Sequence, residues 1–190
     1  LAKTEDDAIA FPAKHFENFY LNGVGGASDP RVALRDKLIL LLMQGAGFRA
    51  SEALLLWVTD VFEDPHDNDA VIVRIYNEID GKAPDNWKSR KGVSTRKAYL
   101  QEKYGRTPRQ EMLGTQRLGW KSRMVDHKDS YLEGYFFPNE YRYVFMKLWR
   151  EYLVYRAAVH CNHPYAFISF DSRYLGNPYT QNAFNQSYAL

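Results

Sequence analysis

Apolar residues recur at helical spacing in several stretches of the chain. The clearest stretch begins behind Pro30 and ends before Gly45 and Gly47, boundaries that are typical of a helix. The spacing predicts a helix over 31–43, others over 11–21 and 139–158, and the start of a last one over 179–190. Ser51 is a suitable N-cap for a short helix over 51–57, whose residues from Ala53 to Trp57 are all apolar.

Two other stretches favour extended structure. Residues 70–76 (AVIVRIY) are rich in β-branched and aromatic side chains and predict a strand. Residues 120–125 (WKSRMV) predict another short strand, and 165–170 (YAFISF) a buried strand or turn. Residues 80–117 are polar and lack a hydrophobic period, which predicts an inserted loop or a partly helical excursion.

Together these elements predict a mostly helical α+β domain with a small antiparallel β-sheet. We place the domain at 31–190, with a basic insertion at about 80–118. Residues 1–30, which contain the glycines of GVGG, are predicted to form an N-terminal arm and linker.

Charge is distributed unevenly, although the net charge is only +2. Residues 50–80 carry eight acidic residues and one basic residue, whereas residues 82–128 carry thirteen basic and four acidic residues. A block of this kind attracts polyanions and makes binding salt-dependent, but it is also common on solvated surfaces.

Composition excludes several classes of protein. With 45% hydrophobic and 25% charged residues among 190, the chain has the balance of a globular protein rather than a disordered one. Its apolar runs are too short for a membrane helix, and a single cysteine, Cys161, excludes an internal disulfide. The acidic start LAKTEDD lacks a signal-peptide core, so we expect a cytoplasmic protein. Because the first residue is Leu, the sequence is interpreted as a piece of a longer protein.

One region carries a specific pattern of motifs. Residues 34–61 contain Arg35-Asp36 in the apolar helix, then Gly47-Phe48-Arg49-Ala50-Ser51-Glu52, then leucines leading to Asp60. Further on stands His163-Pro164-Tyr165-Ala166-Phe167-Ile168-Ser169. Both segments resemble, in order, the first half of the catalytic domain of the tyrosine recombinases, the phage-integrase family. The resemblance implies a partial recombinase catalytic domain that acts in DNA integration and recombination for a mobile element.

The resemblance implies that Arg49 is the first of two arginines that bind the scissile phosphate. A guanidinium suits this role because it stays charged and forms parallel hydrogen bonds to phosphate oxygens. The plainer interpretation is a surface arginine paired with Glu52 or an aspartate, and we expect Glu52 to be a structural partner. The resemblance also implies a lysine that protonates the leaving 5′-oxygen; Lys121 fits best, while Lys88 and Lys91 remain alternatives.

The rest of the family's active site is missing from this sequence. None of the five histidines begins a His-x-x-Arg motif, and no tyrosine stands where the family's nucleophile should. We therefore expect the chain alone to be inactive, while the parent protein would cleave and rejoin DNA through a phosphotyrosine intermediate. His160 and His163 have a spacing that could suit a metal, but no further cysteine supports it, and we expect neither a metal nor another cofactor.

Two other functions are compatible with the sequence. The chain could be a non-catalytic nucleic-acid-binding module that uses the basic insertion, or a domain whose acidic and basic halves bind a protein partner. For DNA contacts we predict six residues, Lys88, Arg90, Lys91, Arg96, Lys97 and Arg123. The expected partner is double-stranded DNA, on which the parent would be multimeric and this chain a monomer.

Overall fold

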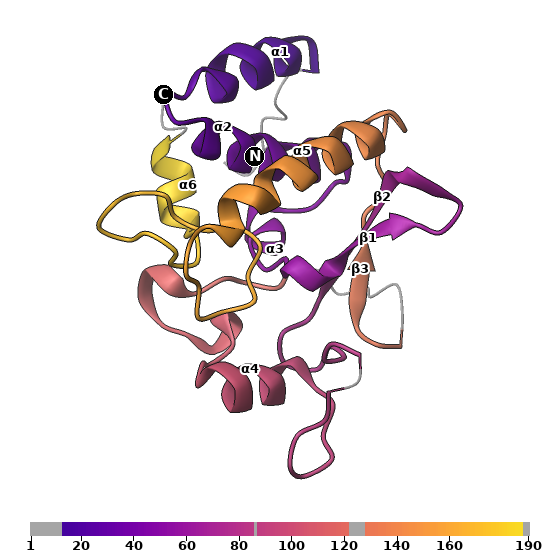
Figure 1. Cartoon of the computed structure of the whole chain (residues 1–190), viewed down its shortest axis with the longest axis vertical. Coiled ribbons are helices and arrows are strands. Elements are labelled where there is room, and N and C mark those ends of the chain that lie inside the picture. Colours follow the sequence, from indigo (N-terminus) through magenta and orange to yellow (C-terminus); the bar gives the residue numbers. More distant parts are fainter. Residues whose placement is uncertain (1–12, 86, 122–127, 188–190) are drawn as a thin grey trace, which may run out of the picture.

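The computed structural model describes residues 13–85, 87–121 and 128–187, and it shows an α+β fold (Figure 1). The helices are α1 (Ala13–Asn18), α2 (Pro30–Leu40), α3 (Ala50–Ala53), α4 (Arg96–Tyr104), α5 (Tyr141–Ala157) and α6 (Gln181–Ser187). The strands are β1 (Val61–Asp64), β2 (Asp67–Tyr76) and β3 (Tyr131–Glu133). None of the helices in the described ranges has the length and apolar character to cross a membrane.

The core is built around α5, which packs against α2 on one side and against β2 of the sheet. α2 begins where the sequence predicts, because the Asp29 side chain accepts a hydrogen bond from the backbone N–H of Arg31 and Pro30 occupies the first turn. It continues as a wider π-helical turn over Leu41–Gly45. α5 confirms the helix predicted over 139–158. Phe16 of α1 is buried and lies near Tyr141, so the predicted arm contributes to this core.

The sheet is antiparallel, with β2 between β1 and β3. β2 contains the strand predicted over 70–76, and its residues Val71, Val73 and Ile75 are buried as the alternation requires. The third strand is β3, which pairs Arg74 with Glu133. The strand predicted over 120–125 lies largely outside the described residues.

The helix predicted over 51–57 is wrong in its second half, because α3 ends at Ala53. Leu54, Leu55, Leu56 and Trp57 are all fully or almost fully buried. Trp57 instead bridges to Tyr165 in an extended conformation, and Leu56 accepts a hydrogen bond from the N–H of Ala166. A run that is buried on every side has no periodicity from which helix and extended chain can be distinguished.

The basic insertion is folded rather than a solvated loop. Within it, α4 is capped by the Thr95 side chain and ended by Gly105 in a left-handed conformation with φ of 62°. Tyr99 and Leu100 of α4 form a second hydrophobic cluster with Ala83, Trp57 and Tyr165.

Arg109 attaches the insertion to the rest of the chain. Its side chain is buried and donates hydrogen bonds to the carbonyls of Leu54, Gln116 and Tyr179. These three carbonyls belong to distant parts of the sequence, so one guanidinium links the insertion to the core.

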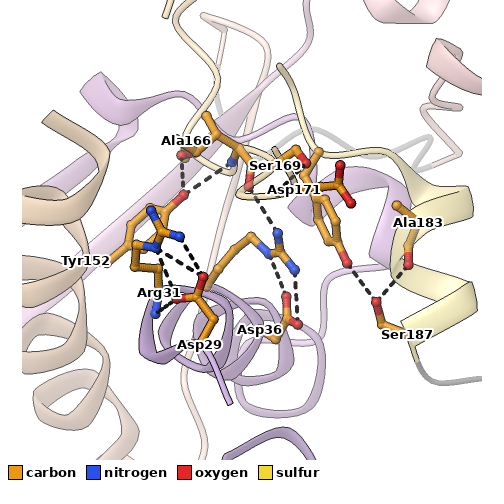
Figure 2. Close-up of polar contacts among 12 residues, drawn as sticks. Asp29, Arg31, Asp36, Tyr152, Ala166, Ser169, Asp171, Ala183 and Ser187 are labelled. Carbon is orange, nitrogen blue, oxygen red and sulfur yellow. Dashed lines mark hydrogen bonds and ion pairs between the residues drawn. The ribbon is translucent and has the colours of Figure 1, made fainter. Parts of the chain in front are cut away.

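A buried polar network holds the segment between α5 and α6 against α2. Arg35 forms an ion pair with Asp36 at 2.7 Å, donates to the carbonyl of Ile168, and lies 3.5 Å from the centre of the Tyr179 ring. The Tyr152 hydroxyl of α5 donates to the carbonyl of Ala166, as Figure 2 shows. The Arg35-Asp36 pair of the sequence motif is therefore structural.

Candidate functional site

Arg49 lies at the N-cap position of α3, directly after a tight turn. Gly47 has a φ of 76°, which glycine adopts without strain, and it lets the chain reverse between α2 and α3. Glu52 accepts hydrogen bonds from the backbone N–H of Arg49 at 3.1 Å and from its Nη1 at 3.3 Å. The Glu52 side chain is 2% exposed and that of Arg49 is 57% exposed. A buried carboxylate thus orients an exposed guanidinium, and Glu52 is a structural partner as expected.

Arg49 lines a shallow hollow of about 370 Å³ between the α3 turn and the sheet. Its described lining comprises Ala46, Gly47, Phe48, Arg49, Glu52, Leu132, Glu133 and Tyr135. Glu133 is paired with Arg74 at 2.8 Å, so the hollow contains acidic as well as basic groups. The face around Arg49 is concave, and its described lining contains two acidic side chains, Glu52 and Glu133, beside one basic side chain.

The lysines proposed as general acid do not lie in this lining. Lys121 is exposed and follows Trp120 and the buried Leu118, whose N–H donates to the carbonyl of Arg109. Lys88 and Lys91 are exposed elsewhere in the insertion. Among the described residues, the structure brings none of the three into the hollow with Arg49.

Arg96, one of the predicted DNA contacts, is buried in the structure. Its side chain is 3% exposed and forms two hydrogen bonds with the buried Asp60, at 2.5 and 2.7 Å. The guanidinium also lies between the rings of Trp57 and Tyr76, 4.0 and 4.1 Å from their centres. The charge of Arg96 is therefore paired inside the protein. This pairing holds the start of α4 in place.

The other predicted DNA contacts differ in how they are presented. Lys97 is 37% exposed and paired with Glu111 at 2.6 Å, while Arg123 lies outside the described residues. Lys88, Arg90 and Lys91 are exposed in the segment 87–93, which we call the basic tip. The structure gives these three side chains no ion pair with any described residue, and the tip projects beyond α4 at the lower end of Figure 1.

The basic tip is an ordered turn. The Ser89 hydroxyl accepts hydrogen bonds from the N–H groups of Lys91 and Val93, and Gly92 has a φ of 77°. At the base of the tip, the Trp87 ring packs edge-on against Tyr99 of α4, with ring centres 5.1 Å apart. The three basic side chains of the tip therefore project from a backbone turn that is held by hydrogen bonds.

His163 of the second motif is a buried structural residue. Its Nε2 lies 2.8 Å from the carbonyl of Gly176, and Nδ1 has no hydrogen-bond partner among the described residues. The pKa of His163 is lowered to about 4, first by burial and also by repulsion from Arg156, Arg106 and Arg109, while the hydrogen bond with Gly176 acts in the opposite direction. No group of three His, Cys, Asp or Glu residues in the described chain is arranged to hold a metal ion.

The acidic residues of the β1–β2 hairpin form ion pairs with α5, whereas Asp60 pairs with Arg96 of the basic insertion. Arg150 pairs with Glu63 and Asp69 at 3.0 and 3.3 Å, and Arg142 pairs with Asp64. The Tyr143 hydroxyl donates to Asp67. These acidic side chains are therefore paired within the chain, although Glu63 and Asp69 stay exposed.

Comparison of the chain with protein-family models, with curated proteins and with solved structures found no match.

Proposed function

We propose that this chain is part of a site-specific DNA recombinase that cleaves and rejoins DNA through a phosphotyrosine intermediate. In this proposal Arg49 binds the scissile phosphate. The observation that carries it is the pairing of a 57% exposed guanidinium with a 2% exposed carboxylate at a fixed turn. An arginine in this position keeps its charge, and more than half of its side-chain surface is in contact with solvent.

The chemistry needs a positive group at this place. When a tyrosine oxygen attacks the phosphorus, negative charge grows on the non-bridging oxygens, and the bond to the 5′-oxygen breaks as that oxygen takes up a proton. Arg49 would stabilise the growing charge, and Lys121 is the proposed proton donor, with Lys88 and Lys91 as alternatives. The nucleophile and the second arginine would come from elsewhere in the protein, because this sequence contains no His-x-x-Arg motif.

Duplex DNA would be attracted by the insertion. Lys88, Arg90 and Lys91 on the basic tip offer charge to the phosphate backbone without requiring a particular sequence. The same observation favours the second candidate function, a nucleic-acid-binding module without catalysis, because DNA binding by the basic tip does not depend on Arg49.

A trapping experiment distinguishes the two functions. The gene product, read from its own start codon to its own stop codon, is incubated with nicked duplex DNA carrying its recombination site, and covalent protein–DNA complexes are separated under denaturing conditions. The enzyme proposal predicts such a complex, formed about 10²- to 10³-fold more slowly by Arg49→Ala. Binding without any covalent complex would support the non-catalytic module.

The general acid is identified with a second substrate. If the 5′-bridging oxygen is replaced by sulfur, the leaving thiolate needs no proton. Among Lys121→Ala, Lys88→Ala and Lys91→Ala, the variant that is slow on the oxygen substrate and recovers on the sulfur substrate has lost the acid. If the sulfur substrate restores the cleavage rate of none of the three variants, the proton donor is another residue.

A further inference from the structure

Two exposed aromatic residues stand close together in the sequence, and one of them, Tyr135, lines the Arg49 hollow. In the segment between β3 and α5, Tyr135 is 73% exposed and Phe137 is 83% exposed, whereas Phe136 between them is 8% exposed. We call Tyr135 and Phe137 the aromatic lip. Large aromatic side chains are ordinarily buried, and two that point outward together are a mark of a binding surface.

The backbone that carries the lip is held at several points. The N–H of Gly134 donates to the carbonyl of Val73, and the N–H of Phe137 donates to the carbonyl of Gly45, both at 2.9 Å. Phe136 packs against Phe145 of α5, with ring centres 5.6 Å apart. The two exposed rings are therefore carried by a fixed backbone. This reduces the conformational entropy that the segment loses when the rings bind a ligand.

The lip stands next to the predicted phosphate site. Tyr135 lines the same hollow as Arg49, and Gly45, which accepts the hydrogen bond from Phe137, lies at the start of the turn that leads to Arg49. The segment runs from the end of β3 to the start of α5 (Figure 1). A nucleotide whose phosphate contacts Arg49 would bring its base, or that of a neighbour, to these rings.

We propose that Tyr135 and Phe137 stack on an unpaired base of DNA beside the phosphate that Arg49 binds. This inference rests on the proposed function, since strand exchange requires bases to leave their pairs near the cleaved phosphate. The π faces of a tyrosine and a phenylalanine suit stacking on any base, and such contacts tolerate all sequences. Two rings are far fewer than the roughly 20 to 30 residues of a stable protein interface, which favours a nucleobase over a protein partner.

The test compares two single-stranded probes that carry the same phosphates. One is an oligothymidylate and the other an abasic strand of equal length, each labelled and titrated with the 190-residue chain at one salt concentration. The wild-type chain should bind the probe with bases about tenfold more tightly or better. Phe137→Ala and Tyr135→Ala should each remove most of that preference while leaving the affinity for the abasic strand unchanged.

Three further variants show whether stacking is responsible. Phe137→Tyr keeps a ring and should retain the preference, whereas Phe137→Leu keeps an apolar side chain without a π face and should lose it. Leu113→Ala removes another side chain that is 88% exposed, from a part of the insertion outside the hollow lining, and should change nothing. Unchanged urea unfolding midpoints are expected for all of them, because the altered atoms are solvated.

The inference is overturned if both probes bind wild type equally, or if Phe137→Leu binds bases as wild type does. It is also overturned if the lip variants abolish self-association in sedimentation without changing DNA affinity, which would make the lip a protein interface. These failures are separate from that of the proposed function. The trapping experiment depends on Arg49 and can succeed while the lip variants bind like wild type.

Discussion

At the scale of single residues, the same side chain serves opposite purposes in this protein. Arg49 and Arg96 are both arginines at the start of helices, yet one is 57% exposed and the other 3% exposed. The difference lies in their partners. Glu52 accepts a hydrogen bond from Arg49 at 3.3 Å, whereas Asp60 and two aromatic rings surround the buried Arg96.

The first prediction compares Arg96 with its neighbour Lys97. Arg96→Ala leaves the Asp60 carboxylate buried without its cation, and should lower the free energy of unfolding by about 3–5 kcal/mol. Lys97→Ala removes a partly exposed pair with Glu111 and should cost less than about 1 kcal/mol. Urea unfolding monitored by tryptophan fluorescence measures both. Equal losses would mean that the Asp60–Arg96 pair does not stabilise the fold.

The second prediction concerns pH and His163. Its pKa is about 4 in the folded protein against an ordinary 6.5, so the unfolded chain binds more protons between these values. The contribution of His163 to the free energy of unfolding is therefore fully present above pH 6.5. It falls as the pH drops toward 4, by at most about 3 kcal/mol.

Carboxylates titrate in the same range, so the readout is the difference between wild type and His163→Gln. The difference in unfolding free energy between the two proteins should be largest near pH 7 and shrink toward pH 4. A difference that does not change with pH would show that His163 is not held neutral by burial.

At the scale of elements, the sequence predicts what has a period and misses what depends on distant partners. α2, β2 and α5 follow their apolar spacing and lie close to the expected ranges. α3 stops early because Leu54–Trp57 meet the segment around Tyr165, more than a hundred residues away. α4 has suitable caps in Thr95 and Gly105, but its Arg96 looks like surface charge in the sequence because Asp60 is far away along the chain.

The candidate site shows the same division. Arg49 and its partner Glu52 are local in sequence, so the motif alone predicts both. The hollow requires β3 to approach the α3 turn, and the mixed charge of its lining depends on Glu133, which pairs with Arg74 across the sheet. Sequence reasoning misses Tyr135 and Phe137 because an aromatic side chain is expected in the core, and only the fold shows that Phe136 takes the buried place.

The third prediction belongs to the basic tip. Changing Lys88, Arg90 and Lys91 together to Ala should weaken duplex DNA binding at low salt. It should also reduce the slope of log affinity against log salt by up to about 0.9 for each phosphate that the protein no longer neutralises. Fluorescence anisotropy at several salt concentrations measures both quantities.

A matched control is Lys147→Ala, an exposed cation on α5 far from the tip in sequence, compared with Lys88→Ala alone. Lys147→Ala should leave the slope unchanged. If the two single variants weaken binding equally, the interaction follows net charge and the tip is not a defined DNA contact.

At the scale of the whole molecule, charge is sorted by the fold. The acidic residues of the β1–β2 hairpin form ion pairs with Arg142 and Arg150 of α5. Arg96 and Arg109 form buried hydrogen bonds that attach the insertion to the core. Three exposed cations stand together on the basic tip, while others, Lys121 and Lys147 among them, lie singly elsewhere and Arg49 lines its own hollow. The arrangement is consistent with one surface that attracts DNA and another that acts on a single phosphate.

The phosphate role of Arg49 is tested most directly by removing the phosphate charge. Cleavage by the whole gene product is timed on a normal scissile phosphodiester and on a neutral methylphosphonate at the same position, for wild type and Arg49→Ala. If Arg49 stabilises negative charge on the phosphate, Arg49→Ala should slow cleavage about 10²- to 10³-fold on the phosphodiester and only slightly on the methylphosphonate. An equal loss on both substrates would contradict the assignment, because Arg49 would then act on the structure rather than on the phosphate charge.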